Sequence, residues 1–329
     1  MEIISDKKSF NWFPGHMNKT LKKVEQMLKW VDLIIEVVDA RAPYSTQNPM
    51  IKKIIKQSDK NKLMIFTKND LADESVTRKW ISVFEKQGNK CFVIKDHKKP
   101  ITKEFIKLIE KLTAKSRKKQ EKRGIDNPEI NVMILGIPNV GKSTVISRVV
   151  KNKKIKIANM PGITKGLQRF VLTDSINLYD TPGVLPSKFE SELVAFNCAA
   201  VNAININVVP KERLAARMMR YIYEVYPNVI ENRYDIKKQL PRPISYEDAF
   251  KLFEEIAKRK NMFVFNDMPN VNKAIDLFIN DLINNKLQKI SYESPLNIGE
   301  PTAIEETLIN DGEEIDPNST SDFENGIEW

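Results

Sequence analysis

Short apolar runs alternate with amphipathic segments through the first half of the chain. The runs are rich in β-branched residues, as expected for strands buried in a parallel sheet. The segments between them repeat apolar residues at helical spacing. We expect strands over residues 33–39, 62–66, 91–94, 130–135 and 176–179, with helices over 49–55, 76–87 and 103–112 between them. This alternation predicts an α/β fold with a doubly wound sheet.

Helical spacing dominates the second half of the chain. Apolar residues recur at helical intervals over 190–201, 210–226, 246–259 and 272–287. From residue 297 the chain is acidic and poor in aromatic residues, a composition typical of disorder. We therefore expect an α/β domain over 1–187, a small, mainly α-helical C-terminal domain over 188–296, and an acidic disordered tail over 297–329.

Charge is distributed unevenly along the chain. The net charge is +10, but residues 297–329 contain 10 acidic and no basic side chains. The remaining 296 residues carry all 53 Lys and Arg but only 33 of the 43 acidic side chains. A body this basic predicts a polyanionic partner, with nucleic acid as the main candidate. A lysine-rich chain with solvated faces is the alternative, and residues 115–124 are expected to form a charged, solvated connector.

The two cysteines, Cys91 and Cys198, lie far apart in the sequence, which argues against a disulfide framework and for a reducing compartment. No run approaches the roughly 18 apolar residues of a membrane span. The first ten residues contain Glu2 and Asp6 and lack the apolar core of a signal peptide. We expect a cytoplasmic protein that acts as a monomer and has no membrane partner.

A phosphate-binding pattern follows the strand expected over 130–135. Residues 136–143 have the sequence Gly-Ile-Pro-Asn-Val-Gly-Lys-Ser, which fits G-x-x-x-x-G-K-[ST] and precedes a helical segment. In such a unit, backbone N–H groups close around the phosphates of a nucleotide. Lys142 would reach the β- and γ-phosphates, and the Ser143 hydroxyl would bind Mg²⁺. We expect nucleotide contacts from Asn139, Val140, Gly141, Lys142, Ser143 and Thr144.

A second loop, residues 67–70, follows the strand expected over 62–66. Its sequence, Thr-Lys-Asn-Asp, resembles the N-K-x-D motif with which GTPases read guanine. The Asp of that motif accepts two hydrogen bonds that guanine can donate and adenine cannot, and the Lys stem covers the base. Thr67 departs from the usual Asn, and in isolation the loop would be explained better as a polar turn. We expect base contacts from Thr67, Lys68, Asn69 and Asp70.

Two further loops fit the phosphate end of a GTP site. A Gly/Pro-rich loop over 160–166 contains Thr164, the candidate for the mobile threonine that caps Mg²⁺ in GTPases. The strand expected over 176–179 ends in the sequence D-T-P-G, which fits D-x-x-G. Asp180 would hold Mg²⁺ through water, and the Gly183 N–H would sense the γ-phosphate.

The order of these motifs differs from that of Ras-like chains, in which the phosphate loop comes first. Here the base motif precedes the phosphate loop, the Thr164 loop and D-T-P-G. A doubly wound sheet that is cut and rejoined gives this order, so we expect a P-loop GTPase domain with circularly permuted motifs. Val184 and Leu185 stand where Ras-like enzymes place the glutamine that orients water. The catalytic group must therefore come from elsewhere in the chain or from a partner.

Beside these motifs, the chain contains Asn-Trp-Phe-Pro-Gly-His-Met at 11–17, Val-Asp-Ala-Arg-Ala-Pro at 38–43 and Asn-Pro at 48–49. This set resembles the RbgA (YlqF) family of circularly permuted GTPases, which act in assembly of the large ribosomal subunit. The resemblance continues through residue 295 and so covers all but the tail. It implies GTP and GDP as nucleotides, Mg²⁺ as cofactor, and a precursor of the large subunit, with its rRNA and ribosomal proteins, as partner.

The resemblance also implies roles for two residues. His16 would be the substitute catalytic residue, which positions or activates water once the ribosomal partner orders the site. Packing within an aromatic N-terminal hook is the alternative. Asn139 matches an asparagine that coordinates K⁺ in related GTPases, where K⁺ supplies charge in place of an arginine finger. A purely turn-forming Asn139 is the alternative.

Two functions of different class fit these observations. The first is a slow GTPase that binds the large-subunit precursor in the GTP state, is stimulated by it and is released on hydrolysis. The second is a nucleotide-gated RNA-binding module in which turnover is incidental. Asp70 disfavours a third function, an ATPase or small-molecule kinase, because its carboxylate matches guanine.

Overall fold

The chain divides into two units, each defined by contacts among its own residues. The first consists of Met1–Asp70 and Phe84–Ala195, and the second of Leu71–Val83 and Phe196–Trp329. The computed structural model describes residues 22, 24–58, 60–94, 101–150, 157–158, 168–186, 188–236, 240 and 242–296. The division differs from the expected boundary at 187/188 in two respects. It falls eight residues later, and it places residues 71–83 with the helical unit.

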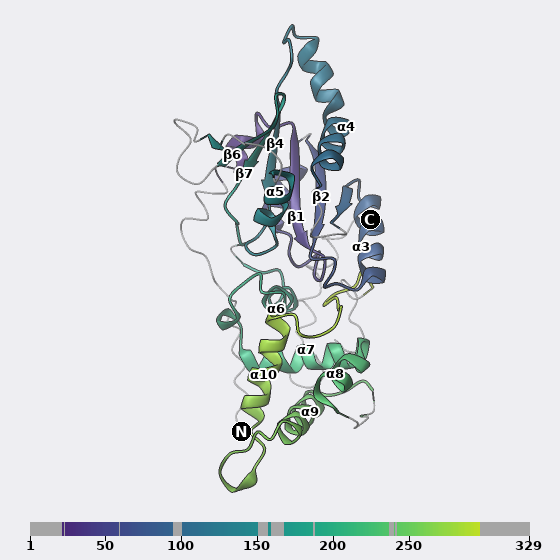
Figure 1. Cartoon of the computed structure of the whole chain (residues 1–329), viewed down its shortest axis with the longest axis vertical. Helices are drawn as coiled ribbons and strands as arrows, with labels where there is room; N and C mark the ends of the chain where they lie inside the picture. Colours follow the sequence, from purple (N-terminus) through teal and green to yellow (C-terminus); the bar gives the residue numbers. More distant parts are fainter. Residues whose placement is uncertain are drawn as a thin grey trace, which may run out of the picture. The chain divides into compact units, whose positions relative to one another are not determined.

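The first unit is built on a seven-stranded sheet with the order β3-β2-β1-β4-β7-β6-β5 (Figure 1). Neighbouring strands from β3 to β7 in this order are parallel, and β6 pairs antiparallel with both β7 and β5. The strands are β1 (Leu33–Asp39), β2 (Asn61–Thr67), β3 (Lys90–Val93), β4 (Ile130–Leu135), β5 (Ile157–Ala158), β6 (Gln168–Thr173) and β7 (Ile176–Asp180).

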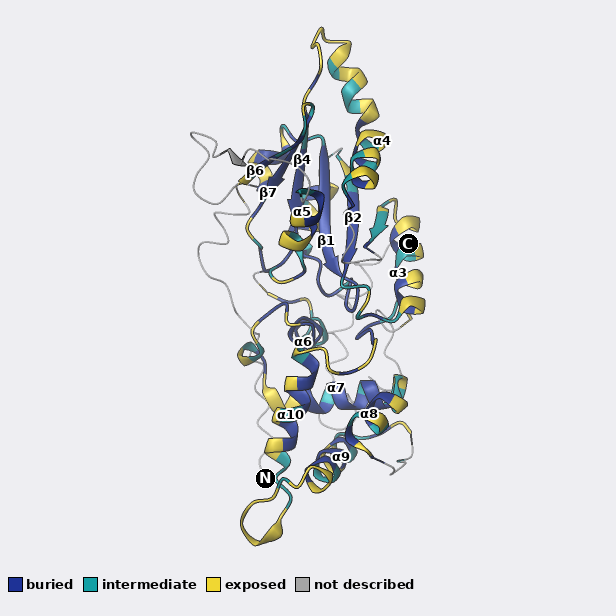
Figure 2. Ribbon diagram, in the orientation of Figure 1, coloured by how far each residue is buried: buried dark blue, intermediate teal, exposed yellow. Residues whose placement is uncertain are grey.

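The central strands are buried along most of their length (Figure 2). Every residue of β1 is buried, and β2 is buried over its last five residues. Full burial explains why these strands appear as continuous apolar runs rather than alternating patterns. Each Val, Ile or Leu in such a position stabilises the fold by about 1.5–3 kcal/mol. The expected α/β sheet is thereby confirmed.

The helices of the first unit include α2 (Pro49–Lys56), α4 (Thr102–Glu121) and α5 (Lys142–Val150). The end of α4 differs from the sequence prediction, because most of the connector expected over 115–124 is helical. The side chains of Ser116 and Gln120 both donate hydrogen bonds to the Asp32 carboxylate. Polar anchoring of this kind continues the helix beyond its last apolar residues, which the apolar pattern alone did not predict.

The second unit contains most of α3 (Glu74–Lys86). From residue 196 on, the rest of this unit is mainly helical. Its helices there are the end of α6 (Glu192–Ala200), η1 (Ile206–Val208), α7 (Lys211–Val225), α8 (Pro227–Tyr234), α9 (Tyr246–Arg259), η2 (Phe265–Asp267) and α10 (Val271–Ile283). Two hydrogen bonds connect α3 and the residue before it to the last described residues. Trp80 Nε1 donates to the Glu293 carbonyl at 3.3 Å, and the Asp73 N–H donates to Ser291 Oγ at 3.2 Å. No helix of the described residues is long and apolar enough to span a membrane.

Candidate nucleotide site

Four loops lie at one edge of the sheet in the first unit. The strands β2, β1, β4 and β7 are neighbours in that order and run parallel, so their carboxyl ends meet at the same edge. Ligands of open α/β sheets bind at this edge. The loops that leave these strands contain residues 67–70, 39–43, 136–143 and 180–183. The fold therefore brings the base motif, the phosphate loop and D-T-P-G together.

The loop over 136–143 turns tightly between β4 and α5. A Cβ atom on Gly136 would lie 2.7 Å from a carbonyl oxygen of β1, so this close approach requires glycine. Gly141 has a φ of 98°, in the left-handed region that favours glycine. The N–H groups of the first turn of α5 have no partner within the helix. A loop of this shape before a helix N-terminus is suited to bind phosphate.

Lys142 folds over this loop. Its ammonium donates hydrogen bonds to two carbonyl oxygens of the loop, at 3.0 and 3.2 Å. Burial lowers the pKa of Lys142, and the Asp180 carboxylate opposes that shift. Ser143 and Thr144 follow in the first turn of α5, where both are exposed. The loop thus presents one ammonium and two hydroxyl groups to a phosphate chain.

Asp180 ends β7 beside the phosphate loop. Its Oδ1 is buried and has no hydrogen-bond partner among the described residues. Burial raises the pKa of Asp180, and Lys142 opposes the shift. A Cβ atom on Gly183 would lie 2.9 Å from the Pro138 nitrogen, so the D-T-P-G backbone approaches the loop as closely as glycine allows. A buried carboxylate oxygen without a partner beside a phosphate loop fits a hydrated Mg²⁺ ion.

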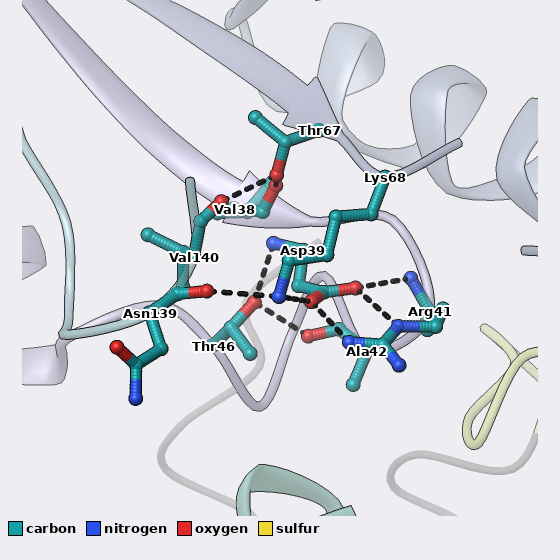
Figure 3. A network of polar contacts seen from close by, with 9 residues as sticks. All are labelled: Val38, Asp39, Arg41, Ala42, Thr46, Thr67, Lys68, Asn139 and Val140. Atoms are coloured by element: carbon teal, nitrogen blue, oxygen red, sulfur yellow. Dashed lines mark hydrogen bonds and ion pairs between the residues drawn. The ribbon is translucent and has the colours of Figure 1, made fainter. Parts of the chain in front are cut away.

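A buried carboxylate, Asp39, links the base motif to the end of β1 (Figure 3). Its two oxygens accept hydrogen bonds from Arg41 Nε at 2.9 Å and Arg41 NH2 at 2.7 Å. Lys68 Nζ lies 2.8 Å from the second oxygen. Burial alone would raise the pKa of Asp39, but the Arg41 and Lys68 charges hold it below its ordinary value. Asp39 is therefore ionised and neutralised by two cations.

The base motif is also tied to the phosphate loop (Figure 3). Thr67 Oγ1 lies 3.0 Å from the Val38 carbonyl oxygen and 2.5 Å from that of Val140. Lys68 Nζ donates to the Asn139 carbonyl oxygen at 2.8 Å. Lys68 and Asn139 both have positive φ angles, 54° and 59°. The two nucleotide loops thus hold each other through side chains of residues 67 and 68.

The remaining residues of the base motif differ in exposure. Asn69 is half-buried, whereas Asp70 is exposed. An exposed carboxylate at this position can accept hydrogen bonds from a base that enters from solvent. The structure therefore places Asp70, the residue expected to select guanine, at the surface.

Val184 and Leu185, which follow D-T-P-G, are both buried. The Val184 N–H donates to the Gly136 carbonyl oxygen at 3.4 Å, and the Val184 carbonyl oxygen accepts from Asn48 Nδ2 at 2.7 Å. Asn48 is also the N-cap of α2, since its Oδ1 accepts from the N–H groups of the first turn. The segment after D-T-P-G is thus fixed by its backbone, and neither aliphatic side chain can orient water.

Comparison with known proteins identifies the family. The family model described as "50S ribosome-binding GTPase" matches residues 131–236. The Ribosome biogenesis GTPase A of Bacillus licheniformis is 35% identical over 284 residues, which are 86% of this chain and 98% of that protein. This chain belongs to the ribosome biogenesis GTPase A family. The protein of that name from Bacillus cereus is 34% identical over 88% of this chain and 95% of its own.

A solved structure supports the fold of this family member. The crystal structure of GNP-bound YlqF from T. maritima has a TM-score of 0.54 and 24% sequence identity, over 85% of this chain and 100% of that chain. The resemblance to the RbgA (YlqF) family, inferred from the motifs, is confirmed by the sequence relatives.

Three residues that contribute to the geometry of the site were not predicted from the sequence. Asp39, Arg41 and Asn48 belong to segments that carried the family resemblance, but no role was assigned to them. A usable signal was present, since a carboxylate ends a strand that is otherwise apolar except for Glu36, and an arginine follows two residues later. His16 and Thr164 lie outside the described residues.

Proposed function

We propose that this chain is a circularly permuted GTPase that binds the precursor of the large ribosomal subunit in its GTP state and leaves it after hydrolysis. One observation carries the proposal. The base motif at the end of β2 precedes the phosphate loop in the sequence, yet strand order places both at the same edge of the sheet. Membership of the ribosome biogenesis GTPase A family supports GTP hydrolysis as the activity.

At the phosphate end, Lys142 binds the β- and γ-phosphates once its ammonium exchanges loop carbonyl oxygens for phosphate oxygens. Ser143, Asp180 and Thr164 are the proposed Mg²⁺ ligands, directly or through water. Mg²⁺, when bound, supplies positive charge to the phosphates. The Gly183 N–H is the proposed donor to the γ-phosphate. These roles use the closeness of D-T-P-G to the phosphate loop.

At the base end, Asp70 accepts hydrogen bonds from guanine, and the Lys68 stem covers the base. The Lys68 ammonium is held by Asp39 and by the phosphate loop, so the stem is fixed before the nucleotide binds. Thr67 replaces the usual asparagine and connects to the phosphate loop through its hydroxyl. Guanine selectivity is therefore proposed despite the departure at position 67.

For catalysis we propose His16 as the group that positions or activates water when the ribosomal partner is bound. Support comes from the family resemblance and from the burial of Val184 and Leu185, which leaves no water-orienting side chain at the usual place. Asn139 is the proposed K⁺ ligand through its side chain, which points away from the polar network in Figure 3.

The proposed partner is the large-subunit precursor, reached through rRNA and ribosomal proteins by a monomeric, cytoplasmic protein. The basic charge of residues 1–296 and the ribosome-binding family description support this assignment. A nucleotide-gated RNA-binding module is the second candidate. The aliphatic side chains of Val184 and Leu185 predict slow intrinsic turnover under either function, so stimulation by the ribosome must distinguish the two.

The deciding experiment measures steady-state GTP hydrolysis by the purified protein in KCl, with and without large ribosomal subunits. Stimulation of about tenfold would lower the effective barrier by about 1.4 kcal/mol and support the ribosome-triggered enzyme. Tight GTP binding without stimulation, on both mature and precursor subunits, would favour the gated module instead. Equal affinity for ATP and GTP would contradict both.

A further inference from the structure

A row of five lysines runs along α4, at positions 103, 107, 111, 115 and 119. Their spacing is four residues throughout. In an α-helix such residues form one continuous ridge, in which each step advances about 6 Å along the axis and turns by about 40°. The ridge is therefore about 24 Å long. All five lysines are exposed.

The lysine ridge lies opposite the face that α4 buries. The buried residues of the helix are Phe105, Ile109 and Thr113, which form a second row of the same spacing. Each follows a ridge lysine by two residues, which places the rows about 200° apart around the helix axis. The two rows turn together, so the first three lysines face away from the domain, and Lys115 and Lys119 continue the ridge beyond the buried row. Figure 2 shows exposed residues along the outer side of α4.

The ridge stands on a fixed helix rather than on a frayed end. Ser116 and Gln120 bind the Asp32 carboxylate, and Arg117 NH2 donates to Ser175 Oγ at 3.2 Å. These contacts hold the C-terminal half of α4 to the rest of the first unit. In Figure 1 this half extends beyond the ends of the strands, where it is accessible to a large partner.

The lysine ridge is electrostatically unfavourable in the isolated protein. Like charges at i and i+4 on a helix repel each other, and four such pairs follow in sequence here. Ion pairs among the described residues do not involve these five side chains. Residues 102–123 contain nine basic and three acidic side chains, so the surrounding helix does not neutralise the ridge. An anionic partner would relieve the repulsion between these lysines, and this relief would favour binding.

We propose that the lysine ridge of α4 binds the phosphate backbone of double-helical rRNA. The inference rests on the proposed function, since that function makes rRNA the partner. The 6 Å step of the ridge, about four residues of helix rise, is close to the separation of successive phosphates along a nucleic-acid strand. Lysine ammonium groups act as point charges, which suits phosphate contact without base recognition. The apolar face of α4 is buried in its own domain, so the helix cannot insert into a lipid surface.

The test compares two charge-matched triple variants of the full chain. The ridge variant carries Lys107→Gln, Lys111→Gln and Lys115→Gln. The control variant carries the same change at Lys53, Lys56 and Lys86, which are exposed helical lysines outside the ridge. Glutamine is as good a helix former as lysine, so both variants should fold. Circular dichroism and basal GTP hydrolysis should match wild type in both.

The measurement is affinity for purified large-subunit rRNA, for a random-sequence RNA duplex and for large ribosomal subunits, across a KCl titration with a non-hydrolysable GTP analogue present. Each phosphate contact contributes about 0.9 to the slope of log K against log salt. The ridge variant should therefore lose about 3 from that slope and on the order of 100-fold in affinity near 0.1 M salt. A third variant with Lys→Arg at the same three ridge positions should keep wild-type affinity, because charge is retained.

Several outcomes would overturn the inference. Equal slopes for the ridge and control variants would show that only overall charge matters. Loss of binding to ribosomal particles, with RNA binding intact, would point to an acidic ribosomal protein on the ridge instead. Both results would leave the proposed function standing, because the wild type would still bind RNA or particles. A wild type that binds neither would contradict the proposed function as well.

Discussion

Replacement of Asp39 by asparagine tests whether the buried ion pairs at the end of β1 support the site. The amide would keep the shape of the side chain but remove the charge that neutralises Arg41, of which only 3% is exposed, and Lys68, of which 27% is exposed. Removal of one partner from a buried pair costs about 3–5 kcal/mol, since it leaves an uncompensated charge. For a domain of this size we expect Tm to fall by roughly 6–20 °C.

The same substitution should weaken nucleotide binding, because Lys68 is no longer held beside the base motif. A lost charge-assisted hydrogen bond corresponds to about 1.5–3 kcal/mol, which is roughly a 10- to 100-fold increase in Kd for GDP. Both effects are measurable, by thermal unfolding followed with circular dichroism and by equilibrium binding of a fluorescent GDP well below the variant's Tm.

Arg78→Gln is the matched control for the Asp39→Asn prediction. Arg78 pairs with Glu74 at 3.0 Å, but both side chains are more than two-thirds exposed. Such a pair contributes about 0.3–0.5 kcal/mol, so Tm should change by only a degree or two. The reasoning about Asp39 is refuted if its asparagine variant is no less stable than Arg78→Gln, or if its GDP affinity equals that of wild type.

Further predictions concern catalysis, metal, local packing and pH. His16→Ala should lower the ribosome-stimulated kcat while leaving GTP affinity unchanged, and equal stimulated rates would remove His16 from the chemistry. Asp180→Asn should weaken GTP binding in Mg²⁺ buffer by about tenfold, yet leave binding in EDTA unaltered; a loss in both buffers would indicate misfolding. Asn48→Ala removes the α2 cap and should cost about 0.5–2 kcal/mol in urea unfolding, and no change would mean that this tether does not stabilise the fold. The stabilisation from Asp39 is present above its unfolded pKa of about 3.9 and is lost as pH falls through its lower folded pKa. The stability gap to Asp39→Asn should thus stay level from neutral pH to about pH 5 and shrink only below about pH 4, and a gap that shrinks at higher pH would contradict the lowered pKa.

The sheet and the nucleotide loops could be predicted from the sequence for a physical reason. Strands buried on both faces are apolar at most positions, so β1 and β4 stand out in a charged chain, although β1 contains Glu36 and Asp39 and β4 contains Asn131. The phosphate loop depends on glycines at fixed positions, so it can also be recognised from the sequence alone. Both patterns involve residues that are close in the sequence, so they can be identified without knowledge of the fold.

The features that were missed depend on contacts between distant segments. The role of Asp39 requires β1 and β2 to be neighbours, since only then does Lys68 reach its carboxylate. The C-terminal half of α4 lacks an apolar face and is held by Asp32, far away in sequence. No periodicity in residues 115–121 could show that partner.

The assignment of residues 71–83 to the second unit constrains how proteins of this kind exchange parts. The chain passes between the two units after Asp70, after Val83 and after Ala195, so the helical unit is made from two separate segments. Recombination at residue 195 would produce a chain with the C-terminal helices of one family member and the Trp80 segment of another. The hydrogen bond from Trp80 to Glu293 would then connect residues of different ancestry. We therefore expect chimaeras that inherit residues 71–83 and the C-terminal helices from the same parent to be more stable than those that do not.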